Sequence, residues 1–225
     1  MYSNQKAGRI SGLLFLFVFI SGVIIFQVLQ GPVLFSEDFL TSTSENTNSI
    51  IGSVLLNMLS GLVSIFIAIL LLPIFKKNHY RLAFLYLAFC ILNFVAIMLD
   101  NVSVVSMLEL SNDYVISGGS EELQVLGNLY YVKHRWTHYL HLLISCFPVF
   151  VLYYGLYISK LVPRVFSVFG VFAVLLMFVE MLFSIFGQSI SMNMMLPMGL
   201  IQLVLPIWLI FKGLKSTQFE EVGQS

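Results

Sequence analysis

The sequence predicts an all-α membrane protein, a bundle of six transmembrane helices forming one domain over residues 1–225, and three observations support this. Hydrophobic residues make up 59% of the 225 residues and charged residues 10%, whereas soluble domains carry about 25% charge. Six apolar runs are long enough, at about 1.5 Å rise per residue, to cross a bilayer core about 30 Å thick. No polar stretch between them approaches the roughly fifty residues of a small soluble domain.

The same composition excludes several classes of function. The formal net charge is zero, so the chain has no basic face for nucleic acid. Two cysteines cannot form a disulfide scaffold, and so apolar a chain is not intrinsically disordered. The partner that composition predicts is therefore the lipid bilayer, with no nucleic acid, while the oligomeric state is not predicted.

The six predicted spans are about 10–29, 50–75, 82–108, 132–159, 165–186 and 195–211. The first follows Lys6 and Arg9, but it is too long for the apolar part of a signal peptide and no small-x-small cleavage site follows it. We therefore expect a retained helix. Proline is expected to kink or end several spans, and Pro148 to open the fourth.

The loop charges predict the orientation of these spans. Nine of the eleven cations fall on one side of the membrane: Lys6, Arg9, Lys76, Lys77, Arg81, Lys160, Arg164, Lys212 and Lys215. Lys133 and Arg135 are the exceptions, and the opposite loops hold seven carboxylates. Because cationic loops resist translocation, we expect both termini to be cytoplasmic in a multi-pass protein of the plasma membrane.

Two longer loops are then external, residues 35–49 and 111–128. Both are predicted to be solvated connectors. In the second, Ser117-Gly118-Gly119-Ser120 is typical of a turn, and we expect it to lead into a short helix capped by Ser120.

Strongly polar side chains within the spans define a layer in the outer half of the membrane. Counted from the predicted outer ends, they lie about 9–13 Å below the surface. They come from five spans: Asn57, Asp100, His138, His141, Glu180 and Gln202. Such groups are costly in lipid and usually face a bundle interior or a wet cavity.

Span four carries the sharpest pattern within this layer. His134, His138 and His141 stand at positions i, i+4 and i+7, so their imidazoles form one helical stripe. One interpretation is a divalent metal site, completed by Asp100 and Glu180. The other is a hydrogen-bonded network that joins the histidines to the carboxylates, Asn57 or Gln202 without a ligand. The sequence leaves both open.

The chain also resembles a known family. Ala7-Gly8-Arg9-Ile10-Ser11-Gly12-Leu13, the polar loop before Asn57, the Leu-Pro exit of span two and Pro163-Arg164 carry the resemblance. They are similar to a family of uncharacterised bacterial six-helix membrane proteins catalogued as a domain of unknown function. His134 stands where that family has a histidine, whereas Ile144-Ser145-Cys146-Phe147-Pro148 replaces its Phe-Phe-Gly-Leu-His run. The resemblance implies the fold and no activity.

Three functional hypotheses follow. The first is binding or transport of a small polar ligand, proton or cation by Asp100, His138, His141 and Glu180. The second is an intramembrane metal-dependent hydrolase acting on a lipid or other amphiphile. In the third, the polar layer only fastens a structural or assembly subunit.

Overall fold

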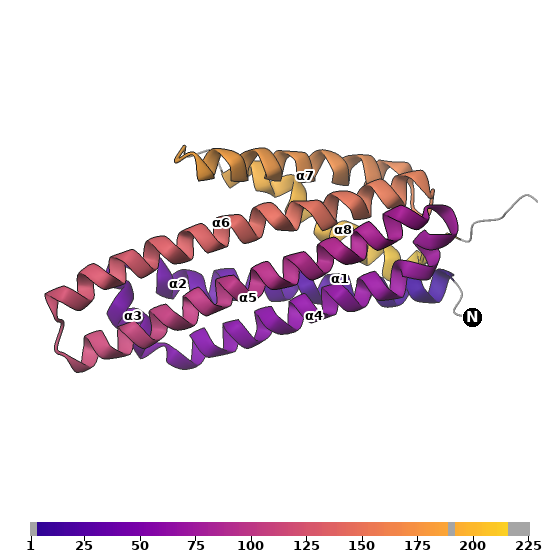
Figure 1. Ribbon diagram of the computed structural model, residues 1–225. Coiled ribbons are helices and arrows are strands. Elements are labelled where there is room, and N and C mark those ends of the chain that lie inside the picture. Colours follow the sequence, from indigo (N-terminus) through magenta and orange to yellow (C-terminus); the bar gives the residue numbers. More distant parts are fainter. Residues whose placement is uncertain (1–3, 189–191, 216–225) are drawn as a thin grey trace, which may run out of the picture.

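The computed structural model describes residues 4–188 and 192–215, and these form helices joined by short turns, with no strand among them (Figure 1). In chain order the elements are α1 (Asn4–Ile24), the π-helix η1 (Ile25–Gln30), α2 (Gly31–Leu34), α3 (Phe39–Glu45), α4 (Thr47–Asn78), α5 (Tyr80–Ile116), α6 (Glu121–Ile158), α7 (Arg164–Ile185), the 3₁₀-helix η2 (Met192–Met195) and α8 (Leu196–Lys212).

The six predicted spans are confirmed as helices long and apolar enough to cross a membrane. Each predicted range lies within one of these helices or agrees with its end to one residue. The helical segments are Asn4–Leu34, Thr47–Lys77, Tyr80–Ile116, Glu121–Ile158, Arg164–Ile185 and Asn193–Lys212. The chain is therefore a multi-pass membrane protein.

The six long helices form a ring. Each packs on two neighbours, in the order α1, α4, α5, α6, α7, α8 and back to α1. Both ends of the described chain lie at one end of this ring, where the Asn4 side-chain amide donates a hydrogen bond to the Lys215 carbonyl. We call this the terminal end. The opposite end, where α5 turns into α6, is the hairpin end.

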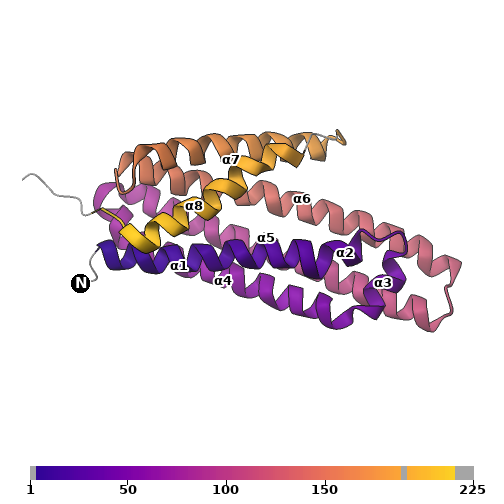
Figure 2. The same cartoon turned by 180° about the vertical axis from the view of Figure 1, so that it is seen from behind.

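The helices of the ring differ in length. With 37 and 38 residues, α5 and α6 are each about 55 Å long, whereas α7 has only 22 residues. The α5–α6 hairpin therefore extends beyond α7 (Figure 1). Seen from behind, α8 crosses the bundle diagonally, from beside α7 to the start of α1 (Figure 2).

The structure corrects the expectation for the first external loop. Residues 35–49 are not a solvated connector, because they contain α3, which packs on α5. Leu40 and Thr43 are buried, and Leu40 lies directly over Gly127 of α6. The projecting hairpin offers an apolar surface that this short helix covers.

The second loop is also shorter than expected. The chain turns at residues 117–120, with Gly118 and Gly119 at φ +74° and +91°, angles that favour glycine. Ser120 occupies the position before α6, but its side chain makes no capping hydrogen bond. The expected short helix is simply the first turns of α6, since no proline or glycine pair interrupts the chain after Ser120.

At the terminal end, α1 packs closely against the end of α8 through two glycines. A Cβ atom at Gly12 would lie 2.8 Å from the Pro206 carbonyl oxygen and 2.9 Å from the Ile210 nitrogen, and one at Gly8 would meet the Leu214 backbone. Such small-xxx-small spacing lets membrane helices approach closely. The contact closes the ring between its first and last helices.

We predict that Gly12→Ala destabilises the bundle by about 1–3 kcal/mol, because the added methyl must push two backbones apart. Gly52→Ala in α4 is the matched control, since a Cβ atom there has no neighbour within 4 Å. Alanine also favours a helix over glycine by about 1 kcal/mol, so the control should be neutral or stabilising. Thermal unfolding in detergent measures both. Equal unfolding temperatures for the two variants would contradict the close packing.

Candidate functional site

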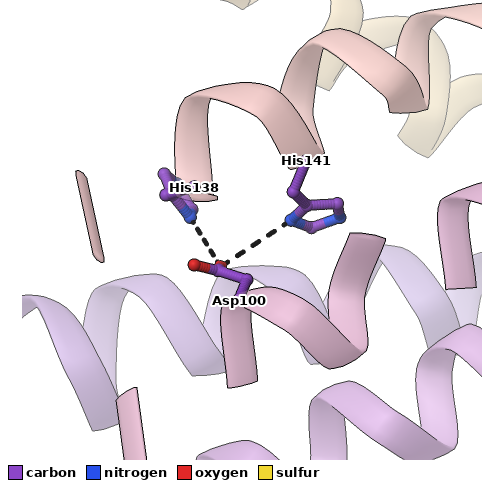
Figure 3. A group of neighbouring side chains, drawn as sticks. All are labelled: Asp100, His138 and His141. Atoms are coloured by element: carbon purple, nitrogen blue, oxygen red, sulfur yellow. Dashed lines mark hydrogen bonds and ion pairs between the residues drawn. The ribbon is translucent and has the colours of Figure 1, made fainter. Parts of the chain in front are cut away.

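The histidine stripe of α6 faces α5 at a single carboxylate. His134, His138 and His141 lie on one side of α6, and α5 is the neighbour that this side meets. Asp100 of α5 is the group they share. Figure 3 shows the Asp100 carboxylate between His138 and His141, with both rings pointing toward it. One acidic side chain thus gathers imidazoles from two turns of the facing helix.

The two oxygens of Asp100 have different partners. Oδ1 accepts a hydrogen bond from the Thr137 hydroxyl at 2.8 Å and lies 3.2 Å from Nδ1 of His134. Oδ2 forms a hydrogen bond with Nδ1 of His138 at 3.1 Å and lies 3.9 Å from Nδ1 of His141. The first oxygen therefore anchors the carboxylate, and the second faces the remaining imidazoles.

A second layer of polar groups holds the anchoring side. The Ser103 hydroxyl donates to the Asp100 backbone carbonyl at 2.8 Å, and it also contacts Thr137 Oγ1 at 2.8 Å and His134 Nδ1 at 3.3 Å. Beside it, Asn101 accepts a hydrogen bond from the Asn57 amide and donates to the Val54 carbonyl. Asn57 of the predicted layer thus fastens α4 to α5 next to the cluster.

The side chains of the cluster are largely buried. Asp100 is 4% exposed and His134 7% exposed, while the His138 side chain is the most accessible of the group at 27%. The Phe26 ring stacks on His138, with centroids 6.5 Å apart and planes 13° from parallel. A buried carboxylate needs compensating partners, and imidazoles supply them here.

The arrangement around Oδ2 suits a metal ion. Asp100, His138 and His141 each offer a ligand atom, and these atoms all lie within 4.8 Å of one another. In a tetrahedral zinc site with bonds of about 2.0–2.1 Å, ligand atoms lie about 3.3 Å apart. Nδ1 of His141 is buried and makes no hydrogen bond. The chemistry and spacing of the three groups fit a divalent cation between them.

Two residues of the predicted layer make no hydrogen bond or ion pair with this cluster. Glu180 of α7 is 6% exposed, and its Oε2 is buried with no hydrogen-bond partner. Gln202 of α8 instead lines a cavity at the centre of the ring. Only ten residues separate Gln202 from Lys212, about 15 Å along α8, whereas Asp100 is about 29 Å from Arg81 along α5. Asp100 and Gln202 therefore lie at different distances from the cationic ends of their helices.

The sequence reasoning did not single out Thr137 and Ser103. A usable signal was present, because Thr137 stands three residues after His134 and Ser103 three residues after Asp100, both at helical spacing. Within a span, a hydroxyl residue near a charged side chain is a candidate hydrogen-bond partner for that side chain.

Comparison with known proteins agrees with this fold. The family model described as a domain of unknown function (DUF4386) matches residues 10–213, most of the chain. The chain belongs to the DUF4386 family. The resemblance inferred from short motifs is thereby confirmed. No curated protein and no solved structure matches the chain, so the activity of this DUF4386 protein must be inferred from its own residues.

We predict that Thr137→Val lowers the free energy of unfolding by about 1 kcal/mol or more, because Asp100 Oδ1 loses its hydroxyl donor while the volume of the side chain is kept. Thr137→Ser retains the hydroxyl and should restore most of this loss. Thermal unfolding in detergent compares the two. A valine variant as stable as the serine variant would show that this hydrogen bond does not anchor the carboxylate.

Proposed function

We propose that this DUF4386 protein binds a divalent transition-metal cation of the zinc type through Asp100, His138 and His141. The observation that carries the proposal is the buried Nδ1 of His141, which has no hydrogen bond although it lies beside Asp100 Oδ2 and His138. A cation between the three groups gives this nitrogen a partner.

The donor set favours a transition metal over a proton or a polar organic ligand. Neutral imidazole nitrogen and carboxylate oxygen are the ligands of many zinc sites, and three protein ligands leave a fourth position for water or another ligand. Asp100 Oδ1 remains bound to Thr137 and close to His134, so it orients the carboxylate from outside the site. Such outer contacts commonly tune metal affinity.

The surroundings favour binding over passage of the ion through the bundle. Beyond Phe26, the central cavity is lined by aliphatic, aromatic and neutral polar side chains, with no charged residue among the lining residues. A cation that left the cluster in that direction would lose its ligands in apolar surroundings, at high cost. We therefore place its role at the site itself, as a bound ion.

The orientation that we propose puts this site on the outer side of the plasma membrane. All nine cations of the predicted cytoplasmic set belong to the terminal end of the bundle or to segments joined to it, and seven carboxylates belong to the hairpin end. This charge asymmetry supports cytoplasmic termini. The metal ion would then come from outside the cell.

Metal binding can be measured on purified protein that is stripped with EDTA and titrated with Zn²⁺. We expect one ion per chain for the wild type. Asp100→Asn, His138→Ala and His141→Ala should each lower the affinity by at least about a hundredfold, because each removes a ligand. His134→Ala should lower it by about tenfold, because it removes only an outer contact.

His79→Ala provides the control for histidine loss, because His79 lies between α4 and α5 at the terminal end and is exposed. It should bind Zn²⁺ as the wild type does. A wild type that binds no metal, or a His141→Ala variant with unchanged stoichiometry and affinity, would refute the proposed site and favour a purely structural network.

The orientation has its own test by cysteine labelling in intact cells. Gly118→Cys in the α5–α6 turn should react with a membrane-impermeant maleimide, whereas Lys77→Cys at the end of α4 should react only after permeabilisation. The native Cys90 and Cys146 are buried and give the background. The reverse labelling pattern would place the metal site on the cytoplasmic side.

A further inference from the structure

A cavity of about 480 Å³ lies at the centre of the ring and is lined by residues of all six long helices. Its size falls in the range of roughly 300–1,000 Å³ that is typical of ligand pockets. It reaches Phe26 at the level of His138 and extends past Ser145 toward Tyr86 and Pro206. The cavity thus continues from the histidine cluster toward the terminal end.

The walls of the cavity select for an uncharged, largely apolar ligand. Aromatic and aliphatic side chains form most of the lining, including Phe15, Phe19 and Leu152. The strongest hydrogen-bonding groups among the lining residues are the neutral carboxamides Gln27, Asn93 and Gln202. A charged ligand buried here without a counter-charge would pay a large desolvation cost, which excludes an ionised fatty acid.

The cavity opens toward the lipid-facing surface of α1. Gly22 and Val23 line it, yet Val23 is 44% exposed, and a Cβ atom at Gly22 would have no neighbour within 4 Å. Ten residues earlier, Gly12 is in close contact with α8. The ring is therefore closed at Gly12 and open at Gly22, so a ligand enters from the bilayer.

Asn93 favours a ligand that can donate a hydrogen bond. Its Oδ1 atom is buried and has no hydrogen-bond partner among the described residues, and Asn93 lines the cavity. Leaving a buried acceptor unpaired costs about 1–3 kcal/mol. If the Asn93 carboxamide turns its oxygen toward the cavity, a ligand with a hydroxyl group would donate the missing hydrogen bond, while its hydrocarbon chain would fill the apolar remainder.

We propose that the central cavity is a binding site for an uncharged single-chain lipid with a hydroxyl group, such as a long-chain alcohol, whose O–H donates to the Asn93 carboxamide oxygen when the carboxamide turns toward the cavity. The site is separate from the metal ligands and does not depend on the bound ion. It assigns a use to Asn93, which the metal site leaves unused.

Photolabelling with a diazirine-bearing hexadecanol tests the proposal on the full chain in lipid nanodiscs. Mass spectrometry should locate the label on the lining segments of α1, α5 and α6, and excess unlabelled hexadecanol should suppress it. The matching diazirine palmitate should label these segments at least about tenfold less, because its carboxylate has no counter-charge there. Equal labelling by both probes would overturn the assignment.

Two variants make the test specific. Gly22→Phe places a ring at the opening and should reduce labelling strongly, whereas Gly52→Phe, also at a glycine with open space around it, should not. Asn93→Leu should lower hexadecanol affinity up to about tenfold, the worth of one hydrogen bond. It should leave the unfolding temperature of the lipid-free protein unchanged or higher, because an unpaired acceptor has been removed.

The outcomes separate this proposal from the metal site. EDTA-treated wild type should keep its labelling, so a protein that binds no Zn²⁺ can still confirm the lipid site. If Gly22→Phe and Gly52→Phe label alike, or if label falls only on lipid-facing residues outside the lining, the cavity is not a lipid site. A loss of stability in Asn93→Leu without loss of labelling would show that Asn93 has only a packing role.

Discussion

The arrangement of the hairpin half of this protein depends on one buried carboxylate. Asp100 places a negative charge between α5 and α6 where its surroundings offer little water, and a charge in that position must be compensated. Thr137 and three histidines from successive turns of α6 meet this need. The same contacts set the register of the two longest helices. Ser103 and the Asn101–Asn57 pair then extend the polar contacts from α6 through α5 to α4.

Both oxygens of this carboxylate have a hydrogen-bond partner, but one of the imidazoles beside it does not. Oδ1 has a hydroxyl donor and a nearby imidazole, whereas the group around Oδ2 includes an imidazole nitrogen that is too distant for a hydrogen bond. A network that served only to fasten helices would gain from closing this distance. In the proposed metal site, a cation beside Oδ2 would supply the partner that this imidazole nitrogen lacks. Glu180 also keeps an unpaired oxygen, so pairing is incomplete on α7 as well.

The sequence was sufficient for the features that depend on composition and local spacing. The number of spans follows from the length of the apolar runs. Helical periodicity predicts that His134, His138 and His141 lie on one face of their helix. The depth of a polar side chain in the membrane was harder to predict, because it depends on where each helix ends. Both α5 and α6 continue well past the outer ends that the apolar runs predicted. Gln202 lines the central cavity from α8, a short helix that crosses the bundle diagonally (Figure 2). The pairing of Ser103 with Thr137 needed the register between two helices, which no local pattern contains.

The glycine contact between α1 and α8 also makes the protein asymmetric with respect to the two leaflets of a bilayer. The ring is sealed at Gly8 and Gly12, so lipid in the leaflet at the terminal end meets a closed wall. Gly22 follows Arg9 by 13 residues, about 20 Å along the helix and past the midplane of a 30 Å core. A lipid in the proposed site would therefore enter from the leaflet at the hairpin end, and its identity would follow the composition of that leaflet rather than the average of the membrane.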